Sequence, residues 1–193
     1  MISVCFITNN LHKLEEVRAI VPSIRIVSLQ EIGFTGELRE DFETLEENAL
    51  QKAQQIANQF GIDCFADDSG LEVQALHGAP GARSAHYAGP ERDDGKNMDL
   101  LLKNLHGHPH RKAQFRTVIA LLQGGVTQVF QGTLSGSIAN SKQGTNGFGY
   151  DPIFIPDGYS CTVAQLSMDE KNQISHRSKA VKQLAALLSQ GVS

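Results

Sequence analysis

The chain has 193 residues, of which 40% are hydrophobic and 20% are charged, values typical of one folded globular domain. This composition excludes an extended disordered chain. The formal net charge of −4 at pH 7 excludes a broadly basic nucleic-acid-binding surface, although it leaves room for a local cationic pocket.

The first predicted unit is a strand, a polar turn and a helix. Residues 2–7 are almost all apolar, as in a strand that is covered on both faces. Thr8-Asn9-Asn10 follows, and a helical pattern begins near His12. A turn of this kind offers backbone N–H groups to a phosphate. Lys13 lies in the first helical turn, where the helix dipole disfavours a cation, so a bound anion would remove a conflict; the alternative is a solvated lysine.

Residues 25–29 form the second predicted strand, and the clearest helix follows an acidic segment. Thr44 and Glu47 have the spacing of a capping box, and Gly61 is placed to end the helix. Lys52 borders the apolar face of this helix.

Two adjacent carboxylates follow the next apolar run. Residues 64–66 predict a buried strand that ends at Asp67 and Asp68, before a turn at Ser69-Gly70. Ligands of open α/β sheets bind beyond the carboxyl ends of strands, and a hard divalent metal would offset the repulsion of paired carboxylates. The alternative is a pair of solvated turn residues.

The acidic segment 37–47 offers a second carboxylate. It is typical of a solvated loop that leads into a helix. The alternative makes one of its acids, with Glu40 first, a ligand of the same metal, and the choice among these acids stays open.

The spacing of apolar residues changes in the second half of the chain. A helix is expected from about Asp94, and the histidines after it, in a Gly/Pro connector, predict an exposed loop better than a metal site. From Ala113 apolar residues alternate with period two, and Gln123-Gly124-Gly125 indicates a hairpin. Residues 126–130 and 134–139 are two further predicted strands. This half indicates an antiparallel lobe, and the first half a βαβ lobe.

The glycine-rich loop 144–152 is the second candidate site. Its three glycines permit close backbone approach, Phe148 and Tyr150 supply flat faces, and Asp151 supplies an acceptor. Base stacking suits these residues better than phosphate binding. The alternative is a hairpin loop whose aromatic side chains cover the core.

The last part of the chain again places positively charged residues in the first turn of predicted helices. Ser167 and Glu170 form a second capping box, with Lys171 just inside that short helix. A final helix begins after Ser175, and His176-Arg177 occupies its first turn. Local electrostatic conflicts of this kind are expected at functional sites.

Cysteine usage indicates the compartment. Cys5, Cys64 and Cys161 are odd in number and widely spaced in apolar sequence, which predicts buried free thiols in a reducing environment. The chain has no signal-peptide pattern at its start and no apolar run of membrane-spanning length. We therefore expect a cytoplasmic protein that contacts neither membrane nor nucleic acid.

Taken together, these motifs resemble the inosine-triphosphate pyrophosphatase family, the dITP/XTP pyrophosphatases that remove non-standard purine nucleoside triphosphates. The ordered set covers nearly the whole chain. Its members are Thr8-x-Asn10-x-x-Lys13, Thr44-x-x-Glu47-Asn48-Ala49-x-x-Lys52-Ala53, Asp67-Asp68-Ser69-Gly70-Leu71, Gly78-Ala79-Pro80-Gly81, Gly147-Phe148-Gly149-Tyr150-Asp151-Pro152 and Lys171-x-x-x-Ser175-His176-Arg177.

The resemblance implies an α/β fold with an elongated mixed sheet flanked by helices. Residues 1–193 would form a single domain of two lobes, with a central nucleotide-binding cleft, and the protein would be a homodimer. It also implies a Mg²⁺-dependent hydrolysis of ITP, dITP or XTP to the monophosphate and pyrophosphate. The ranking of these substrates, the number of metal ions and the dimer interface stay open.

The resemblance further implies a role for each matching residue. Asp68 is the expected proton acceptor, and Asp68 and Glu40 are the expected metal ligands. The expected substrate-binding residues are Thr8, Asn9, Asn10, Lys13, Lys52, Ser69, Phe148, Gly149, Tyr150, Asp151, Lys171, His176 and Arg177.

Residue chemistry suggests how bases are selected. His176 and Arg177 are mainly hydrogen-bond donors, which match the 6-oxo group of hypoxanthine or xanthine and not the amino group of adenine. How GTP is excluded stays open. The alternative functions are hydrolysis of a different nucleotide and a nucleotide-binding module without turnover.

Overall fold

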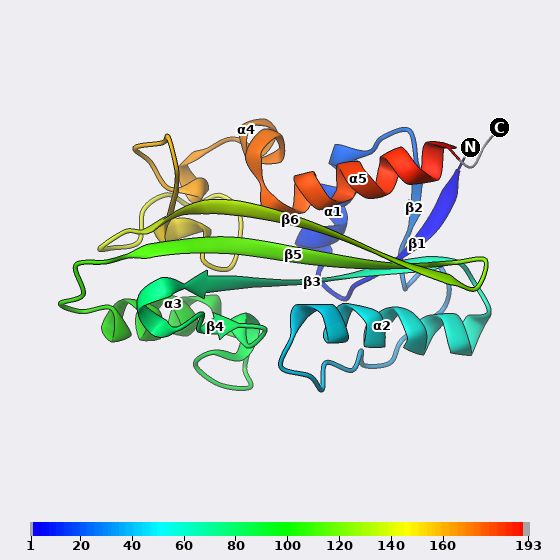
Figure 1. Ribbon diagram of the computed structural model, residues 1–193, viewed down its shortest axis with the longest axis horizontal. Helices are drawn as coiled ribbons and strands as arrows, with labels where there is room; N and C mark the ends of the chain where they lie inside the picture. Colours follow the sequence, from blue (N-terminus) through cyan, green and yellow to red (C-terminus); the bar gives the residue numbers. More distant parts are fainter. Residues whose placement is uncertain (1, 191–193) are drawn as a thin grey trace. The chain divides into compact units, whose positions relative to one another are not determined.

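The computed structural model describes residues 2–190, which form an α/β fold with a mixed sheet flanked by helices (Figure 1). The described helices are α1 (Leu11–Ile20), α2 (Leu45–Phe60), α3 (Asp94–Asn104), α4 (Met168–Ile174) and α5 (His176–Gln190). The described strands are β1 (Ser3–Ile7), β2 (Arg25–Val27), β3 (Cys64–Val73), β4 (Pro80–Gly81), β5 (Lys112–Gln123), β6 (Val126–Ile138) and β7 (Phe154–Pro156).

The strand order is β2-β1-β3-β5-β6-β7, with β4 paired to β3. β1 pairs in parallel with β2 and β3, whereas β4 is antiparallel to β3 and β7 is antiparallel to β6. The predicted α/β class with a mixed sheet is confirmed.

The chain divides into two compact units. Unit 1 comprises the described residues up to Asp68, Thr117–Gly132 and those from His176 onward; unit 2 comprises Ser69–Arg116 and Thr133–Ser175. Three boundaries fall within β3, β5 and β6, and the fourth falls between α4 and α5.

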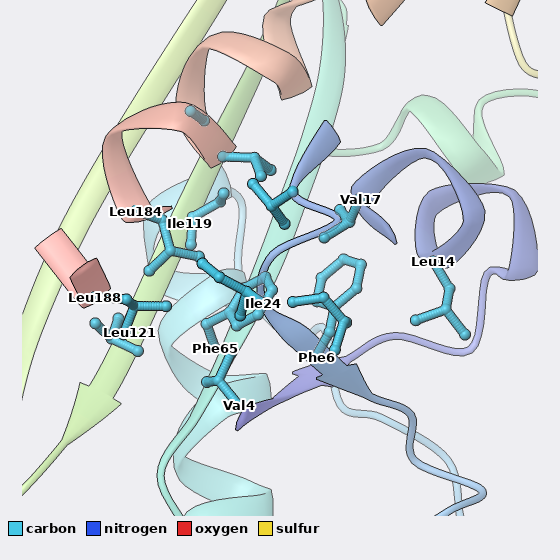
Figure 2. Packing of buried hydrophobic residues seen from close by; sticks show 14 residues of the cluster. Val4, Phe6, Leu14, Val17, Ile24, Phe65, Ile119, Leu121, Leu184 and Leu188 are labelled. Atoms are coloured by element: carbon cyan, nitrogen blue, oxygen red, sulfur yellow. The ribbon is translucent and has the colours of Figure 1, made fainter. Parts of the chain in front are cut away.

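The core of unit 1 lies between its strands and the pair α1 and α5. Figure 2 shows Val4, Phe6 and Phe65 of the strands with Leu184 and Leu188 of α5 in one buried cluster. The Phe6 and Phe65 rings stack with centroids 4.6 Å apart. Helix α2 lies on the other side of these strands, which are therefore covered on both faces, as the apolar run of β1 predicts (Figure 1).

The predicted start of α1 and both predicted ends of α2 are confirmed. The Asn10 side chain caps α1 by accepting a hydrogen bond from the Lys13 N–H at 3.2 Å. Thr44 caps α2 by accepting from the Glu47 N–H, and Gly61 ends α2 in the left-handed conformation at φ 64°. These local signals fix where each helix begins or ends, and so where Lys13 and Lys52 lie along it.

The prediction that a strand ends at the two aspartates is wrong. β3 continues through Asp67 and Asp68 to Val73, and Gly70 is a strand residue and not part of a turn. A Cβ at Gly70 would collide with the carbonyl oxygen of Gly81, so this glycine allows β4 to approach.

The strand that does end here is β1, because its last partner pair is Ile7 with Ala66. The aspartates therefore lie just beyond the carboxyl end of β1.

Two further predictions need correction. Residues 126–130 and 134–139 do not form separate strands, because β6 is continuous from Val126 to Ile138. Gly132 lies between these two ranges, and a Cβ there would collide with the His176 carbonyl oxygen, so this glycine allows close approach of α5. Cys161 is partly exposed, whereas Cys5 and Cys64 are buried free thiols as expected.

The core of unit 2 lies around α3 and the unit 2 parts of the strands. Leu101 and Leu105 are fully buried there, and the rings of Phe115 and Phe154 lie 4.5 Å apart. The predicted helix at Asp94 and the exposed histidine loop 106–110 are confirmed. None of the described helices is long and apolar enough to cross a membrane.

Candidate active site

The turn after β1 and the start of α1 position the first predicted group. The Thr8 hydroxyl accepts from the Asn10 N–H at 3.1 Å, and Asn10 caps α1. This arrangement directs Lys13 toward β3, where its Nζ lies 3.0 Å from a carboxylate oxygen of Asp67. Burial lowers the pKa of Lys13 from its usual value, against the opposing effect of Asp67.

Asp67 joins two cations from distant parts of the chain. Its second carboxylate oxygen lies 3.3 Å from Nε of Arg177, on the first turn of α5, and its side chain is 1% exposed. Burial alone would raise the pKa of Asp67, but Lys13 and Arg177 outweigh burial and hold that pKa well below its usual range. Asp67 is therefore ionised at every physiological pH.

Arg177 also contacts a carboxylate that the sequence analysis did not identify. Its Nη1 lies 2.5 Å from the Glu16 carboxylate, and both residues are buried. Burial opposes the charge of Arg177, yet Glu16 and Asp67 raise its pKa. The signal that was available is the position of Glu16, three residues after Lys13 and so on the same face of α1.

Asp68 lies in a different setting from its neighbour. Its carboxylate oxygens lie 3.3 Å from the Asn48 amide nitrogen and 3.2 Å from Lys52 Nζ, both on α2. Burial raises the pKa of Asp68 above its usual value, although Lys52 opposes this rise. A carboxylate with a raised pKa is a better proton acceptor than an ordinary one.

Lys52 brings Asp68 and Glu40 together. Its Nζ lies 2.6 Å from Glu40 and 3.2 Å from Asp68, and its side chain is 4% exposed. Burial disfavours the charge of Lys52, but Asp68 and Glu40 together raise its pKa. The two predicted metal ligands therefore share one ammonium group.

The residues present fit a magnesium ion. Glu40 and Asp68 are hard oxygen donors next to the same atom, and magnesium is usually held by one or two carboxylates together with substrate phosphates. Burial, together with the neighbouring Glu40 and Asp67 carboxylates, raises the pKa of Asp68, and a nearby divalent cation would favour its ionised form. Among residues 2–190 no three His, Cys, Asp or Glu side chains gather as a metal-binding group.

Unit 2 holds the second predicted group. The Asp151 carboxylate accepts from the Phe148 N–H at 3.0 Å and lies 2.6 Å from Lys171 Nζ. The same Nζ lies 4.7 Å from the centre of the Phe148 ring. A Cβ at Gly147 would collide with Asp151, so the glycine permits this compact loop. Asp151 and Lys171 thus orient the Phe148 ring.

The rest of the loop is anchored to unit 2. The Tyr150 hydroxyl donates to the Ser84 carbonyl oxygen at 2.8 Å, and Tyr150 is buried, which raises its pKa. The Gly149 N–H donates to Asp94 at 2.7 Å, a contact that the sequence analysis missed. Tyr150 therefore covers the core, as the alternative reading of this loop proposed, whereas Phe148 is only partly buried.

The structure gathers the predicted site residues into two groups. Within unit 1 it brings Lys13, Lys52, Asp68, Glu40 and Arg177 into one network around the two aspartates. The buried His176 precedes Arg177 in the same helical turn. The second group lies in unit 2 and consists of Phe148, Gly149, Tyr150, Asp151 and Lys171, and Ser69 is the first residue of that unit.

Sequence comparison assigns this chain to a family. The sequence model of the Ham1 family matches residues 4–187. The chain belongs to the Ham1 family. Among the relatives of this Ham1 protein, one from Flavobacterium psychrophilum is 48% identical over 180 residues, which cover 93% of this chain and 95% of the relative. One from Bacillus licheniformis is 44% identical over 195 residues, which cover 98% of this chain and 100% of the relative. Both relatives are named dITP/XTP pyrophosphatase.

Solved Ham1 structures share the fold. The Ham1 protein of Staphylococcus aureus superposes with a TM-score of 0.89 at 41% identity, over 98% of this chain and 99% of the other. A HAM1 protein from Coxiella burnetii superposes with a TM-score of 0.90 at 36% identity, over 98% of this chain and 100% of the other.

Proposed function

We propose that this chain hydrolyses non-standard purine nucleoside triphosphates, namely ITP, dITP and XTP, to the nucleoside monophosphate and pyrophosphate. The reaction would remove these compounds from the nucleotide pool. Membership of the Ham1 family and the names of the relatives support the substrate class. We further propose that residues 1–193 act as one catalytic domain.

The observation that carries the proposal is the environment of Asp68. This carboxylate is buried, has a raised pKa and lies within 3.2 Å of Lys52. Hydrolysis of a phosphoanhydride requires an oriented water molecule, a proton acceptor and neutralisation of phosphate charge. We assign Asp68 to the acceptor role, in which it takes the proton of the attacking water. Asp67 does not suit this role, because Lys13 and Arg177 lower its pKa and with it its basicity.

We propose that Glu40 and Asp68 hold Mg²⁺ together with substrate phosphate oxygens. When bound, the ion supplies positive charge beside those oxygens. The support is the contact of both carboxylates with Lys52. The prediction is that chelation abolishes turnover and that added Mg²⁺ restores it.

The triphosphate is assigned to the start of α1 and to α2. Lys13 and Lys52 supply positive charge, and Thr8, Asn9 and Asn10 supply the polar turn next to the helix start. The raised pKa of Lys52 keeps its ammonium charged at any physiological pH.

The nucleoside is assigned to a second set of residues. Phe148 offers a flat face for stacking on the base, and Lys171 and Asp151 hold that ring in place. The remaining proposed nucleoside contacts are Ser69, Gly149, Tyr150, His176 and Arg177. Donors at His176 and Arg177 would favour a 6-oxo base over adenine.

The test is a pyrophosphate-release assay with purified protein across ITP, dITP, XTP, GTP and ATP, with and without magnesium. We expect release from the first three substrates and little from ATP and GTP. Binding of ITP without release of pyrophosphate would favour a non-catalytic binding module. Preferred release from a modified pyrimidine triphosphate would refute the purine assignment.

We propose that the protein works in the cytoplasm as a homodimer that contacts neither nucleic acid nor membrane. The acidic net charge of −4 supports the absence of a nucleic-acid surface. Light scattering coupled to gel filtration would give the mass of the particle in solution, and a monomer would refute the dimer.

A further inference from the structure

Within the acidic region 37–47, residues 37–42 form an acidic segment that precedes α2 in the sequence and lies along it. This segment carries Glu40, and its residues 37–41 belong to no helix or strand. Its backbone groups bond instead to side-chain amides of α2. The contacts are Arg39 N–H to Gln55 at 3.0 Å, Gln55 to the Glu37 carbonyl at 2.9 Å, Asp41 N–H to Gln51 at 3.0 Å, Phe42 N–H to Asn48 at 2.9 Å and Asn48 to the Phe42 carbonyl at 3.0 Å.

These three amides form one stripe on α2. Asn48, Gln51 and Gln55 are spaced three and four residues apart, so they lie on the same face of the helix. Each replaces hydrogen bonds that a neighbouring strand would otherwise supply to the segment. The stripe therefore fixes a segment that has no regular structure of its own.

Asn48 differs from the other two amides because it also reaches the catalytic carboxylate. It is 2% exposed, and its amide nitrogen lies 3.0 Å from the Phe42 carbonyl and 3.3 Å from Asp68. A side-chain amide has two N–H donors and one acceptor oxygen, so a single amide can bond both backbone groups of Phe42 and still donate to Asp68.

We infer that Asn48 is a positioning residue that ties the acidic segment to Asp68 and so sets the place of Glu40 next to it. The inference rests on the proposed function, in which Glu40 and Asp68 hold magnesium. Lys52 pairs with both carboxylates but contacts only the side chain of Glu40, whereas Asn48 bonds the backbone two residues further on. Outer partners that orient metal ligands typically contribute about 10–100-fold to metal affinity or activity.

The experiment compares Asn48→Leu and Asn48→Ala with wild type. Leucine has the same number and branching of side-chain heavy atoms as asparagine but cannot form hydrogen bonds. Alanine avoids the larger volume of the two methyl groups and tests the effect of a smaller side chain. Gln54→Ala is the matched control, because Gln54 is an exposed amide on the same helix. One measurement is the magnesium concentration for half-maximal pyrophosphate release from ITP. The other is hydrogen exchange of the Phe42 backbone amide without metal or substrate.

We expect both Asn48 variants to need about 10-fold more magnesium, with a smaller change in KM for ITP at saturating magnesium. The Phe42 amide should exchange faster, and Gln54→Ala should match wild type in both measurements. If neither variant folds, Gln51→Ala should raise the magnesium requirement and the exchange rate of the Phe42 amide, each by a smaller amount.

Wild-type magnesium dependence and wild-type Phe42 exchange in folded Asn48→Leu would overturn the inference. Absence of pyrophosphate release by the wild-type protein would instead refute the proposed function. The exchange comparison would then still show whether Asn48 holds the segment.

Discussion

Arg177 and Asp67 form a buried ion pair between α5 and β3, with Nε 3.3 Å from a carboxylate oxygen and side-chain exposures of 2% and 1%. They are 110 residues apart in sequence. A buried ion pair does not by itself stabilise a fold, but removal of one partner leaves an uncompensated charge. The pair therefore makes the fold of unit 1 depend on residues of the candidate site.

Asp67→Asn is expected to destabilise the protein at pH 7 by about 3 kcal/mol, because Lys13 and Arg177 lose the carboxylate that they share. Chemical denaturation would measure the free energy of unfolding. Asp157→Asn, at an exposed turn, is the control and should behave like wild type. A stability loss no larger than that of the control would contradict the pairing.

The same pair predicts a pH dependence. Because the pKa of Asp67 is lowered on folding, its stabilising contribution is complete above the pKa of an unfolded aspartate, about 4, and is lost as the pH falls toward the folded pKa. The difference in unfolding free energy between wild type and Asp67→Asn should therefore shrink below about pH 4. A difference that stays constant from neutral to acid pH would show that Asp67 is not the titrating group.

Arg177→Ala is expected to weaken ITP hydrolysis more than ATP hydrolysis, because a donor to the 6-oxo group matters only for a base that has one. The measurement is kcat/KM on both substrates. The contacts of Arg177 with Glu16 and Asp67 supply a competing explanation, in which the side chain acts only by holding Asp67. Equal losses on both substrates would favour that explanation over base readout.

Local signals in the sequence predicted those features that depend on neighbouring residues. The cap at Thr44 and the capping box at Ser167 lie within single helical turns, and both appear in the structure. The polar turn after β1 and the aromatic loop at Phe148 were recognised from composition for the same reason.

Long-range contacts were not visible in the sequence. Asp67 looked like the end of a strand because a polar pair followed an apolar run, yet the neighbouring strand β1 is the one that ends. Glu16 was not identified from the sequence, since its partner Arg177 is 161 residues away. Gly70 suggested a turn, and the predicted strands stopped on either side of Gly132, whereas both glycines allow close approach of other segments. Each of these features depends on tertiary packing, which periodicity does not encode.

Asp68→Asn is expected to fold normally and to lose most turnover, by about 10²–10⁴-fold in kcat. Asparagine keeps the shape of the aspartate side chain, and Lys52 keeps Glu40 as a partner, so the fold should be retained. Circular dichroism and thermal unfolding would check the fold, and pyrophosphate release with saturating magnesium would check the rate. A kcat near that of wild type would remove Asp68 from the proton-acceptor role.

Phe148→Ala is expected to raise KM for every purine triphosphate by a similar factor, about 10-fold if the stacking contribution is 1–3 kcal/mol. A flat ring stacks on any base, so the ratio of kcat/KM for ITP to that for ATP should not change. Phe148→Tyr is the matched control, because it keeps the ring that lies against Lys171. A changed ratio would mean that Phe148 also takes part in choosing the base.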